Sequence, residues 1–179
     1  FGTEDQKRDL LGRVAAGGTL AIAMSEPDAG SDVAALKCRA VRDGDEWVID
    51  GRKWCITGAE GAAFAIVVAK TGTDPAARHR NYSLLLVPTD TPGWRIVRHP
   101  EWMGAHSPGG HPEIALEGVR VPAANLLGGE GEGFAIAQAR LGPGRVHHAM
   151  RAIGIAERAL AMTCERARSR TAFGTPLAE

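Results

Sequence analysis

The sequence has few cysteines, and none stands in a pattern that indicates a metal or disulfide site. Cys38, Cys55 and Cys164 lie far apart, and no C-x-x-C pair is present. An odd number of cysteines without such spacing predicts free thiols in a reducing compartment. The composition is rich in arginine and alanine and poor in lysine, which is typical of a GC-rich bacterial source. We therefore expect a cytoplasmic protein.

The sequence also lacks an excess of either charge and lacks a long apolar run. It has 21 Lys and Arg against 21 Asp and Glu, whereas nucleic-acid-binding surfaces are normally basic, so no nucleic-acid partner is expected. A membrane-spanning helix needs roughly 18 or more apolar residues in a row. The longest runs, at 62–69 and 83–88, have only strand length, so no membrane span is expected.

What is present indicates a folded domain with pieces of neighbouring domains. The 179 residues are 44% hydrophobic, which is enough to bury a core. Thr3 and Gln6 form a T-x-x-Q capping box ahead of an amphipathic stretch, so a short helix is expected, ended by Gly17-Gly18.

From residue 20 to about residue 120, short apolar or alternating runs are separated by turn residues. This pattern, without helices between the runs, predicts an antiparallel β-sandwich or small β-barrel. The dipeptides Asp43-Gly44 and Asp50-Gly51 each predict a hairpin turn.

A helical pattern then runs almost to the end of the chain. Ile153, Ala156, Leu160 and Ala167 form an apolar stripe, which predicts packing against partner helices outside this sequence. The segment 142–144, Gly-Pro-Gly, is expected to break or kink the helix into two pieces. The fold class is thus α+β, with a central β domain between a short N-terminal helix and a long C-terminal helix.

The segment "SEPDAGSD", residues 25–32, is unusual because it follows the apolar run "LAIAM" at once. An ordinary turn needs about two to five residues and one Gly or Asn. This segment instead concentrates hydroxyl and carboxyl groups, and Gly30 would let the backbone approach a ligand closely. From the segment alone, a plain turn with solvated acids is an equally good interpretation.

Other motifs give weaker signals. The segment 53–58, "KWCITG", is expected to be a strand. The loop "GGEGEG" matches neither a dinucleotide fingerprint nor a phosphate loop. His99, His106 and His111 could be metal ligands, but no cysteine or carboxylate stands at ligand spacing, so no metal is expected.

Taken together, these motifs resemble the acyl-CoA dehydrogenase family of flavoenzymes. "SEPDAGSD", "DGDEWVIDGRKWCITGA", "LEGVRVPAANLLGGEGEGF" and "RSRTAFG" follow one another in the family's order. "HSPGGHPEI" and "RLGPGRVHHAMRAIGIAERAL" are similar to the branch associated with long-chain and 4-hydroxyacyl-CoA substrates. The resemblance implies the end of an N-terminal helical domain at 1–19, a middle β domain at 20–128 and the start of a C-terminal helical domain at 129–179.

The resemblance also implies that FAD is the cofactor and that the middle domain lines its ring. Met24 and Ser25 would meet the pyrimidine edge, and Ser31 would touch the flavin or the substrate. Thr57 would hydrogen-bond flavin N5, beside Cys55 and Ile56. Cys55 departs from the family, which commonly has an aromatic residue at this position.

Three further residues enter through the same resemblance. Arg170 and Phe173 would contact the FAD pyrophosphate and adenine of a neighbouring subunit, which suits the paired donors of a guanidinium group. Arg145 would contact CoA or substrate, although Gly144 replaces an acidic residue common before this arginine. A homo-oligomer, dimer or tetramer, is implied.

The implied reaction is the α,β-dehydrogenation of a medium- to long-chain fatty acyl-CoA, with hydride transfer to flavin N5. The electron acceptor would be an electron-transfer flavoprotein. The general base, a carboxylate in the family, is expected beyond Glu179, and Glu26, Glu60 and Glu113 are not assigned to this role. No catalytic residue is therefore expected in this chain, which alone should not turn over acyl-CoA.

Two alternatives stay open from the sequence. One is an oxygen-using oxidase or flavin monooxygenase on the same scaffold. The other is a non-catalytic β domain that kept the fold and lost the cofactor.

Overall fold

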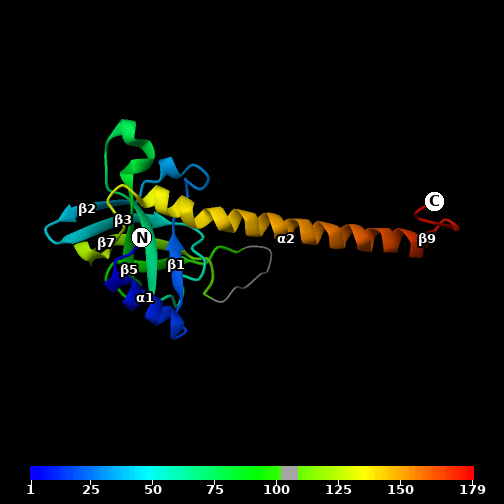
Figure 1. Ribbon diagram of the computed structural model, residues 1–179, viewed down its shortest axis with the longest axis horizontal. Helices are drawn as coiled ribbons and strands as arrows, with labels where there is room; N and C mark the ends of the chain where they lie inside the picture. Colours follow the sequence, from blue (N-terminus) through cyan, green and yellow to red (C-terminus); the bar gives the residue numbers. More distant parts are fainter. Residues whose placement is uncertain (102–108) are drawn as a thin grey trace. The chain divides into compact units, whose positions relative to one another are not determined.

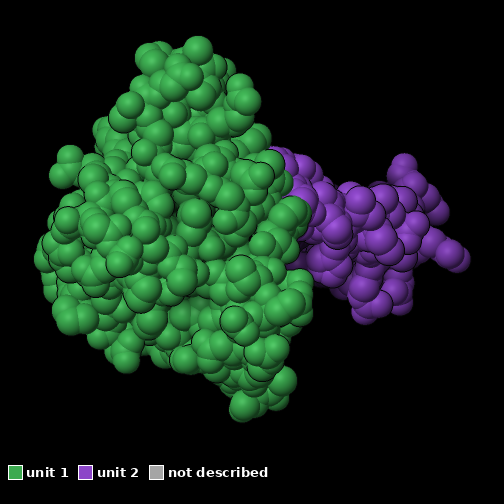
Figure 2. Space-filling view, turned by 60° about the vertical axis from the view of Figure 1, so that its left-hand side comes forward, with its two compact units in different colours: residues 1–136 green, residues 137–179 purple. Residues whose placement is uncertain are grey.

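The computed structural model describes residues 1–101 and 109–179, and the chain divides into two compact units, residues 1–136 and 137–179 (Figure 2). The expected order of short helix, β domain and long helix is confirmed. The main elements are α1 (Glu4–Ala15), β1 (Leu20–Ala23), β2 (Arg39–Asp43), β3 (Glu46–Lys53), β4 (Phe64–Lys70), β5 (Tyr82–Pro88), β6 (Trp94–Arg98), β7 (Glu113–Pro122), β8 (Leu126–Leu127), α2 (Gly133–Ser169), β9 (Thr171–Ala172) and β10 (Thr175–Pro176). Three short 3₁₀ turns are η1 (Val33–Ala35), η2 (Pro75–Asn81) and η3 (Ala123–Asn125).

Helix α1 begins and ends where the capping residues predict. The Thr3 side chain accepts a hydrogen bond from the Gln6 backbone N–H at 3.2 Å, and the Gln6 side chain accepts one from the Thr3 N–H at 3.0 Å. At the other end, Gly17 has φ +93° and Gly18 N–H donates to the Arg13 carbonyl, as in a Schellman cap. The Gln6 amide also donates to the carbonyls of Ala124 and Leu126, which fixes α1 to the β domain.

The β domain is a mostly antiparallel sandwich, as expected (Figure 1). Its eight strands follow the order β6-β7-β3-β2-β4-β5-β8, and β1 pairs with β4 in parallel. Strands β4 and β5 are buried along most of their length, and Ala65, Val67, Leu85 and Val87 are fully enclosed. The run of apolar residues that looked strand-like in the sequence therefore forms the centre of the core.

One of the two predicted hairpin turns is confirmed, and the prediction of the other is wrong. Asp43-Gly44 begins the turn between β2 and β3, where Asp43 pairs with Glu46 and Gly44 has φ +59°. Gly51 instead lies inside β3, at a register shift against β7. A β-bulge forms there because Gly51, with φ +154°, passes directly over Cys38.

The expected break at Gly142-Pro143-Gly144 is also wrong. Helix α2 is continuous through Pro143. A proline removes one backbone hydrogen bond of the helix, and the flanking Gly142 and Gly144 are weak helix formers, but the helix continues through all three residues. Within the second unit, Ile153 and Leu160 of the predicted apolar stripe are exposed. In the described parts of the chain, no helix is both long and apolar enough to cross a membrane.

The bulge at Gly51 gives a stability prediction. A Cβ at Gly51 would lie 2.7 Å from the Cα of Cys38, so Gly51→Ala combines an unfavourable φ with a backbone clash. We expect it to lower the free energy of unfolding by about 3 kcal/mol, measured by urea denaturation. Gly118→Ala is the matched control, because Gly118 has φ +63° but open space around it, and should cost about 1 kcal/mol. Equal losses in the two variants would contradict the close approach to Cys38.

Candidate functional site

The "SEPDAGSD" segment is an ordered bend in which Glu26 is buried, while Asp28 and Asp32 are exposed. Backbone hydrogen bonds join Glu26 and Ala29 in both directions, at 2.8 and 3.1 Å. Asp32 caps η1 by accepting a hydrogen bond from the Ala34 N–H at 3.1 Å. The segment is therefore a shaped bend that leads from β1 to η1. We refer to residues 24–32 as the serine bend.

A buried ion pair joins the serine bend to the end of β3. Lys53 is 0% exposed and Glu26 is 7% exposed. The Lys53 ammonium donates to the Glu26 carboxylate at 2.9 Å and to the Met24 carbonyl at 3.0 Å. Because a buried charge is costly unless it is paired and hydrogen-bonded, this arrangement is strongly specified.

The same carboxylate also reaches β2. Glu26 accepts hydrogen bonds from the backbone N–H groups of Lys37 and Cys38, at 2.6 and 2.9 Å. Burial raises the pKa of the Cys38 thiol to about 11, so this thiol stays protonated and unreactive at neutral pH. Glu26 thus holds three segments of the chain together.

The expected strand over residues 53–58 is wrong beyond Lys53, where β3 ends. Cys55 has φ +54°, in the left-handed region, so the chain turns away from the sheet at this point. The Trp54 N–H donates to the Ser25 carbonyl at 2.7 Å, and the Ile56 N–H donates to the Pro112 carbonyl at 3.0 Å. We refer to residues 54–58 as the threonine turn. It lies directly beside the serine bend.

The structure brings most of the predicted cofactor residues of the first unit together at this junction. Met24 and Ser25 are half-buried, and Cys55 and Thr57 are exposed. The side chain of Ile56 is buried in the core, so only its backbone can face a ligand. Ser31 is exposed further along the serine bend.

The hydroxyl groups of this junction suit the polar edge of a flavin ring. In residues 1–101 and 109–179, the side chains of Ser25 and Ser31 form no hydrogen bond to another residue. Thr57 Oγ1 lies 2.9 Å from His111 Nδ1, and Gly30 has open space where a Cβ would stand. A buried flavin presents carbonyl, N–H and ring nitrogen groups that need such partners. The residues present therefore fit FAD.

A second ionic group supports the threonine turn from the opposite side. The buried carboxylate of Glu113 accepts hydrogen bonds from Arg98 and Arg52, each at 2.8 Å. These hydrogen bonds, of which the one from Arg98 has the larger effect, hold the pKa of Glu113 below its ordinary value. The Arg98 guanidinium also lies 4.9 Å from the centre of the Trp54 ring, in cation–π contact.

The sequence reasoning missed Glu26, Lys53 and His111 as residues that shape this site. The sequence leaves open whether the acids of "SEPDAGSD" are solvated, and it predicts Lys53 only as a strand residue. Their partners are distant in sequence, since Glu26 and Lys53 are 27 residues apart. The one available signal was the alternation along the strand, which puts Lys53 on the same face as the buried Trp47 and Ile49.

The three predicted residues of the second unit lie apart from any enclosed pocket in that unit. Arg145 donates to the Gln138 side chain at 2.8 Å. Arg170 follows the end of α2, and its carbonyl accepts a hydrogen bond from the Leu177 N–H. Phe173 stands with Gly174 at the tip of the β9–β10 hairpin, with φ +54° and a fully exposed ring.

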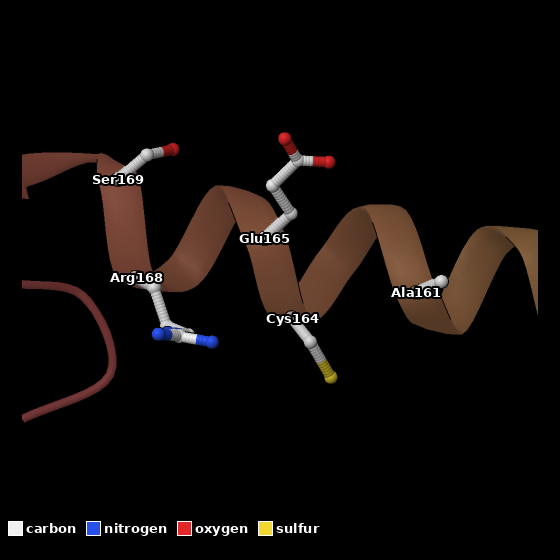
Figure 3. Close-up of a pocket in the computed structure, with 5 residues that line it drawn as sticks. All are labelled: Ala161, Cys164, Glu165, Arg168 and Ser169. Carbon is white, nitrogen blue, oxygen red and sulfur yellow. The ribbon is translucent and has the colours of Figure 1, made fainter.

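A shallow hollow in the same unit contains none of the predicted site residues. It is lined by side chains from a single stretch of α2, which Figure 3 shows pointing in different directions: Ala161, Cys164, Glu165, Arg168 and Ser169. Among the described residues, no cluster of three or more metal-ligating side chains occurs. His106, one of the histidines considered as a ligand, lies outside the described residues. The three cysteines are free thiols, as expected.

Comparison with known proteins identifies the family. Residues 21–119 match the model of the acyl-CoA dehydrogenase middle domain, and residues 131–179 match that of the acyl-CoA dehydrogenase C-terminal domain. The chain belongs to the acyl-CoA dehydrogenase family. It is 51% identical to a Mycobacterium tuberculosis protein described as probable acyl-CoA dehydrogenase FadE2, covering 100% of this chain and 45% of that protein. Human acyl-CoA dehydrogenase family member 11 is 46% identical over 97% of this chain and 23% of its own length.

Solved structures give the same result. An acyl-CoA dehydrogenase from Geobacillus kaustophilus has a TM-score of 0.85 at 38% identity, covering 100% of this chain and 47% of that one. A Mycobacterium smegmatis glutaryl-CoA dehydrogenase in complex with FADH2 has a TM-score of 0.78 at 34% identity, covering 99% and 44%. The prolyl acyl carrier protein oxidase AnaB has a TM-score of 0.83 at 34% identity, covering 99% and 47%. This chain thus spans under half the length of the relatives that it matches.

The buried ion pair gives the first prediction from the site. Lys53→Met leaves the Glu26 carboxylate buried without its counter-charge, so we expect the free energy of unfolding to fall by about 3 kcal/mol or more. Lys37→Met is the control, because the Lys37–Asp28 pair is exposed and should contribute less than about 1 kcal/mol. Urea denaturation of both variants measures the difference. A loss at Lys53 no greater than that at Lys37 would show that the pair does not hold the junction.

The depressed pKa of Glu113 gives a second prediction. A carboxyl group whose pKa is lowered by folding stabilises the protein above its unfolded pKa and loses that contribution as the pH falls. Glu113→Gln should therefore cost about 2 kcal/mol at pH 7, and the difference from wild type should shrink as the pH falls below the ordinary value of 4.5.

The control for this pH dependence lies on the same strand. Glu117→Gln removes an exposed pair with Arg95 and should change stability by less than about 1 kcal/mol at either pH. Unfolding measured at pH 7 and pH 4 tests both variants. A constant difference between Glu113→Gln and wild type across this range would disprove the assignment.

Proposed function

We propose that the protein containing this chain is an FAD-dependent acyl-CoA dehydrogenase that removes hydrogens from the α and β carbons of a fatty acyl-CoA thioester. The observation that carries the proposal is the direct contact between the serine bend and the threonine turn, through the Trp54–Ser25 hydrogen bond. It gathers the hydroxyls of Ser25 and Thr57 on adjoining segments. Similarity to a glutaryl-CoA dehydrogenase in complex with FADH2 supports the choice of cofactor.

The residues of the first unit would hold the flavin ring, and FAD would supply the acceptor for the hydride at its N5 atom. We assign the pyrimidine edge of the ring to the backbone of Met24 and the hydroxyl of Ser25. The Thr57 hydroxyl would donate a hydrogen bond to N5. The backbone of Cys55 and Ile56 would line the same side of the flavin site. Ser31 would face the flavin or the thioester. Donors fixed in this way stabilise charge as it develops and spend no energy on reorganisation.

The residues of the second unit would complete the ligand sites. Arg145 would contact CoA or substrate, and Arg170 and Phe173 would contact the pyrophosphate and adenine of FAD in a neighbouring subunit of a homo-oligomer. The exposure of the Phe173 ring at a hairpin tip supports a contact of this kind. The domain limits that accompany this proposal are 1–19, 20–128 and 129–179.

We assign the general base to no residue of this chain. The carboxylate of Glu26 is occupied by Lys53, and that of Glu113 is occupied by two arginines. Glu60 lies 3.6 Å from His99. The carboxylates of Glu26 and Glu113 are also buried, so neither is placed to reach an α-proton of the substrate, as a general base must be.

For the reoxidation of the flavin we favour an electron-transfer flavoprotein. A matching chain in a structure described as the electron transferring flavoprotein of Acidaminococcus fermentans, with 36% identity and a TM-score of 0.79, supports this choice. The resemblance of "HSPGGHPEI" and "RLGPGRVHHAMRAIGIAERAL" to the long-chain and 4-hydroxyacyl branch is our reason for proposing a medium- to long-chain substrate. The second candidate function is an oxidase, which the similarity to AnaB favours. Rapid oxygen consumption by the reduced protein would identify the oxidase.

The experiment uses the flavin-loaded full-length protein and anaerobic mixing with acyl-CoA. We expect acyl-CoA to bleach the flavin absorbance, and Thr57→Val to slow the bleaching by about 100-fold because one donor to the reacting atom is lost. Thr19→Val is the control, since the Thr19 hydroxyl donates to the Gly61 carbonyl and lies outside the two segments of the site, so this variant should leave the rate unchanged. A full-length protein that takes up no FAD would refute the proposal and favour a non-catalytic β domain.

A further inference from the structure

The segment 109–112 lies along the threonine turn. It belongs to the motif "HSPGGHPEI", of which the structure describes the part from Gly109 onward. Two backbone hydrogen bonds join the two segments, from the Ile56 N–H to the Pro112 carbonyl at 3.0 Å and from the Gly58 N–H to the Gly110 carbonyl at 2.9 Å. Just beyond the turn, the Glu60 N–H donates to the Gly109 carbonyl at 3.1 Å. The threonine turn is therefore held along its length by this segment.

The two glycines of the segment permit this close approach. Gly109 and Gly110 have φ +72° and +57°, and a Cβ on Gly109 would lie 2.8 Å from the Cα of Gly58. A Cβ on Gly110 would lie 2.8 Å from His99 Nδ1. Residues with a side chain would keep the segment away from the turn. The consequence is that the next residue, His111, reaches Thr57.

The contact between His111 and Thr57 has two possible directions. His111 Nδ1 and Thr57 Oγ1 are 2.9 Å apart, and the roles depend on which ring nitrogen of the histidine carries a proton. If Nδ1 accepts, the single hydroxyl proton of Thr57 points at His111. If Nδ1–H donates, the oxygen of Thr57 accepts and its proton is left for another acceptor.

We propose that His111 is a positioning residue that donates its Nδ1–H to Thr57 and so directs the Thr57 hydroxyl proton toward the cofactor. This inference rests on the proposed function, in which Thr57 meets flavin N5. In the oxidised ring N5 has a lone pair and no proton, so its partner must be a donor. Of the two directions, only donation from His111 leaves Thr57 able to act in this way.

The role differs from a structural one because it concerns a proton rather than packing. His111 is half-buried, whereas Thr57 is exposed, so the pair lies at the face open to a ligand. The loss of a merely structural histidine would change stability, but would not affect the flavin through Thr57. This difference makes the inference testable by coupling the two residues in a double-mutant cycle.

The test measures the rate of flavin reduction by saturating acyl-CoA in the flavin-loaded full-length protein, together with the flavin reduction potential. We expect His111→Leu to slow reduction by about tenfold, in the range found for coupled neighbours, and to shift the potential in the same direction as Thr57→Val. The apparent affinity for acyl-CoA should stay the same. His111→Gln keeps a side-chain N–H donor and should restore the rate to within about threefold of wild type.

The decisive comparison is made in the Thr57→Val background. There, His111→Leu should have no further effect on the rate or the potential. An equal slowing by His111→Leu in both backgrounds would overturn the proposal, as would an unchanged rate in wild type.

One further variant serves as the control. His99→Gln is the matched control, because His99 packs on the same segment and lies 3.6 Å from Glu60 rather than near Thr57. It should leave the rate unchanged, and a slowing equal to that of His111→Leu would also overturn the proposal. If His111→Leu does not fold, a His111→Gln protein slower than wild type by tenfold or more contradicts the inference. Failure of the proposed function is a different result, namely a wild-type protein that takes up no FAD or is not reduced by acyl-CoA.

Discussion

The buried ion pair between Lys53 and Glu26 is the constraint on which the candidate site depends. Neither charge can be left alone in the interior, since an unpaired buried charge costs several kcal/mol. Their partners are complete: the ammonium also bonds to the Met24 carbonyl, and the carboxylate also accepts two backbone N–H groups of the segment that enters β2. The pair therefore fixes the end of β1, the start of β2 and the end of β3 relative to one another.

Because the end of β3 is anchored at Lys53, the backbone path of the residues that follow is constrained. Trp54 bonds to Ser25, and Cys55 takes a left-handed conformation that turns the chain away from the sheet. From the other side, the segment 109–112 bonds along the threonine turn, and Arg98 packs on Trp54 while it is held by Glu113. A surface supported on both sides in this way is preorganised, as a binding site needs to be if little energy is to be lost on ordering it.

The parts of the fold that depend on local chemistry could be predicted from the sequence. The capping box of Thr3 and Gln6 and the turn at Gly44 were both predicted correctly, because each needs only neighbours within a few residues. Two of the errors concern contacts made across the fold. Gly51 bulges because Cys38 lies against it, and β3 ends early because its last residue is anchored to the serine bend. The role of Glu26 was missed for the same reason.

The predicted residues of the candidate site also fall into two groups, those that the structure brings together and those whose partners lie outside this chain. The grouping of Met24, Ser25 and Thr57 came from a family resemblance, and the structure adds the physical cause, which is the contact between the two segments. The roles of Arg145, Arg170 and Phe173 still rest on that resemblance, because the partners proposed for them lie outside this chain. Periodicity within one chain does not reveal such partners.

The most direct test of this account is a crystal structure of the full-length protein with FAD bound. We predict that the hydroxyl oxygens of Ser25 and Thr57 both lie within hydrogen-bonding distance, about 2.5–3.2 Å, of polar atoms on one and the same flavin ring. A flavin that contacts only one of the two segments, or that binds elsewhere on the protein, would contradict the account.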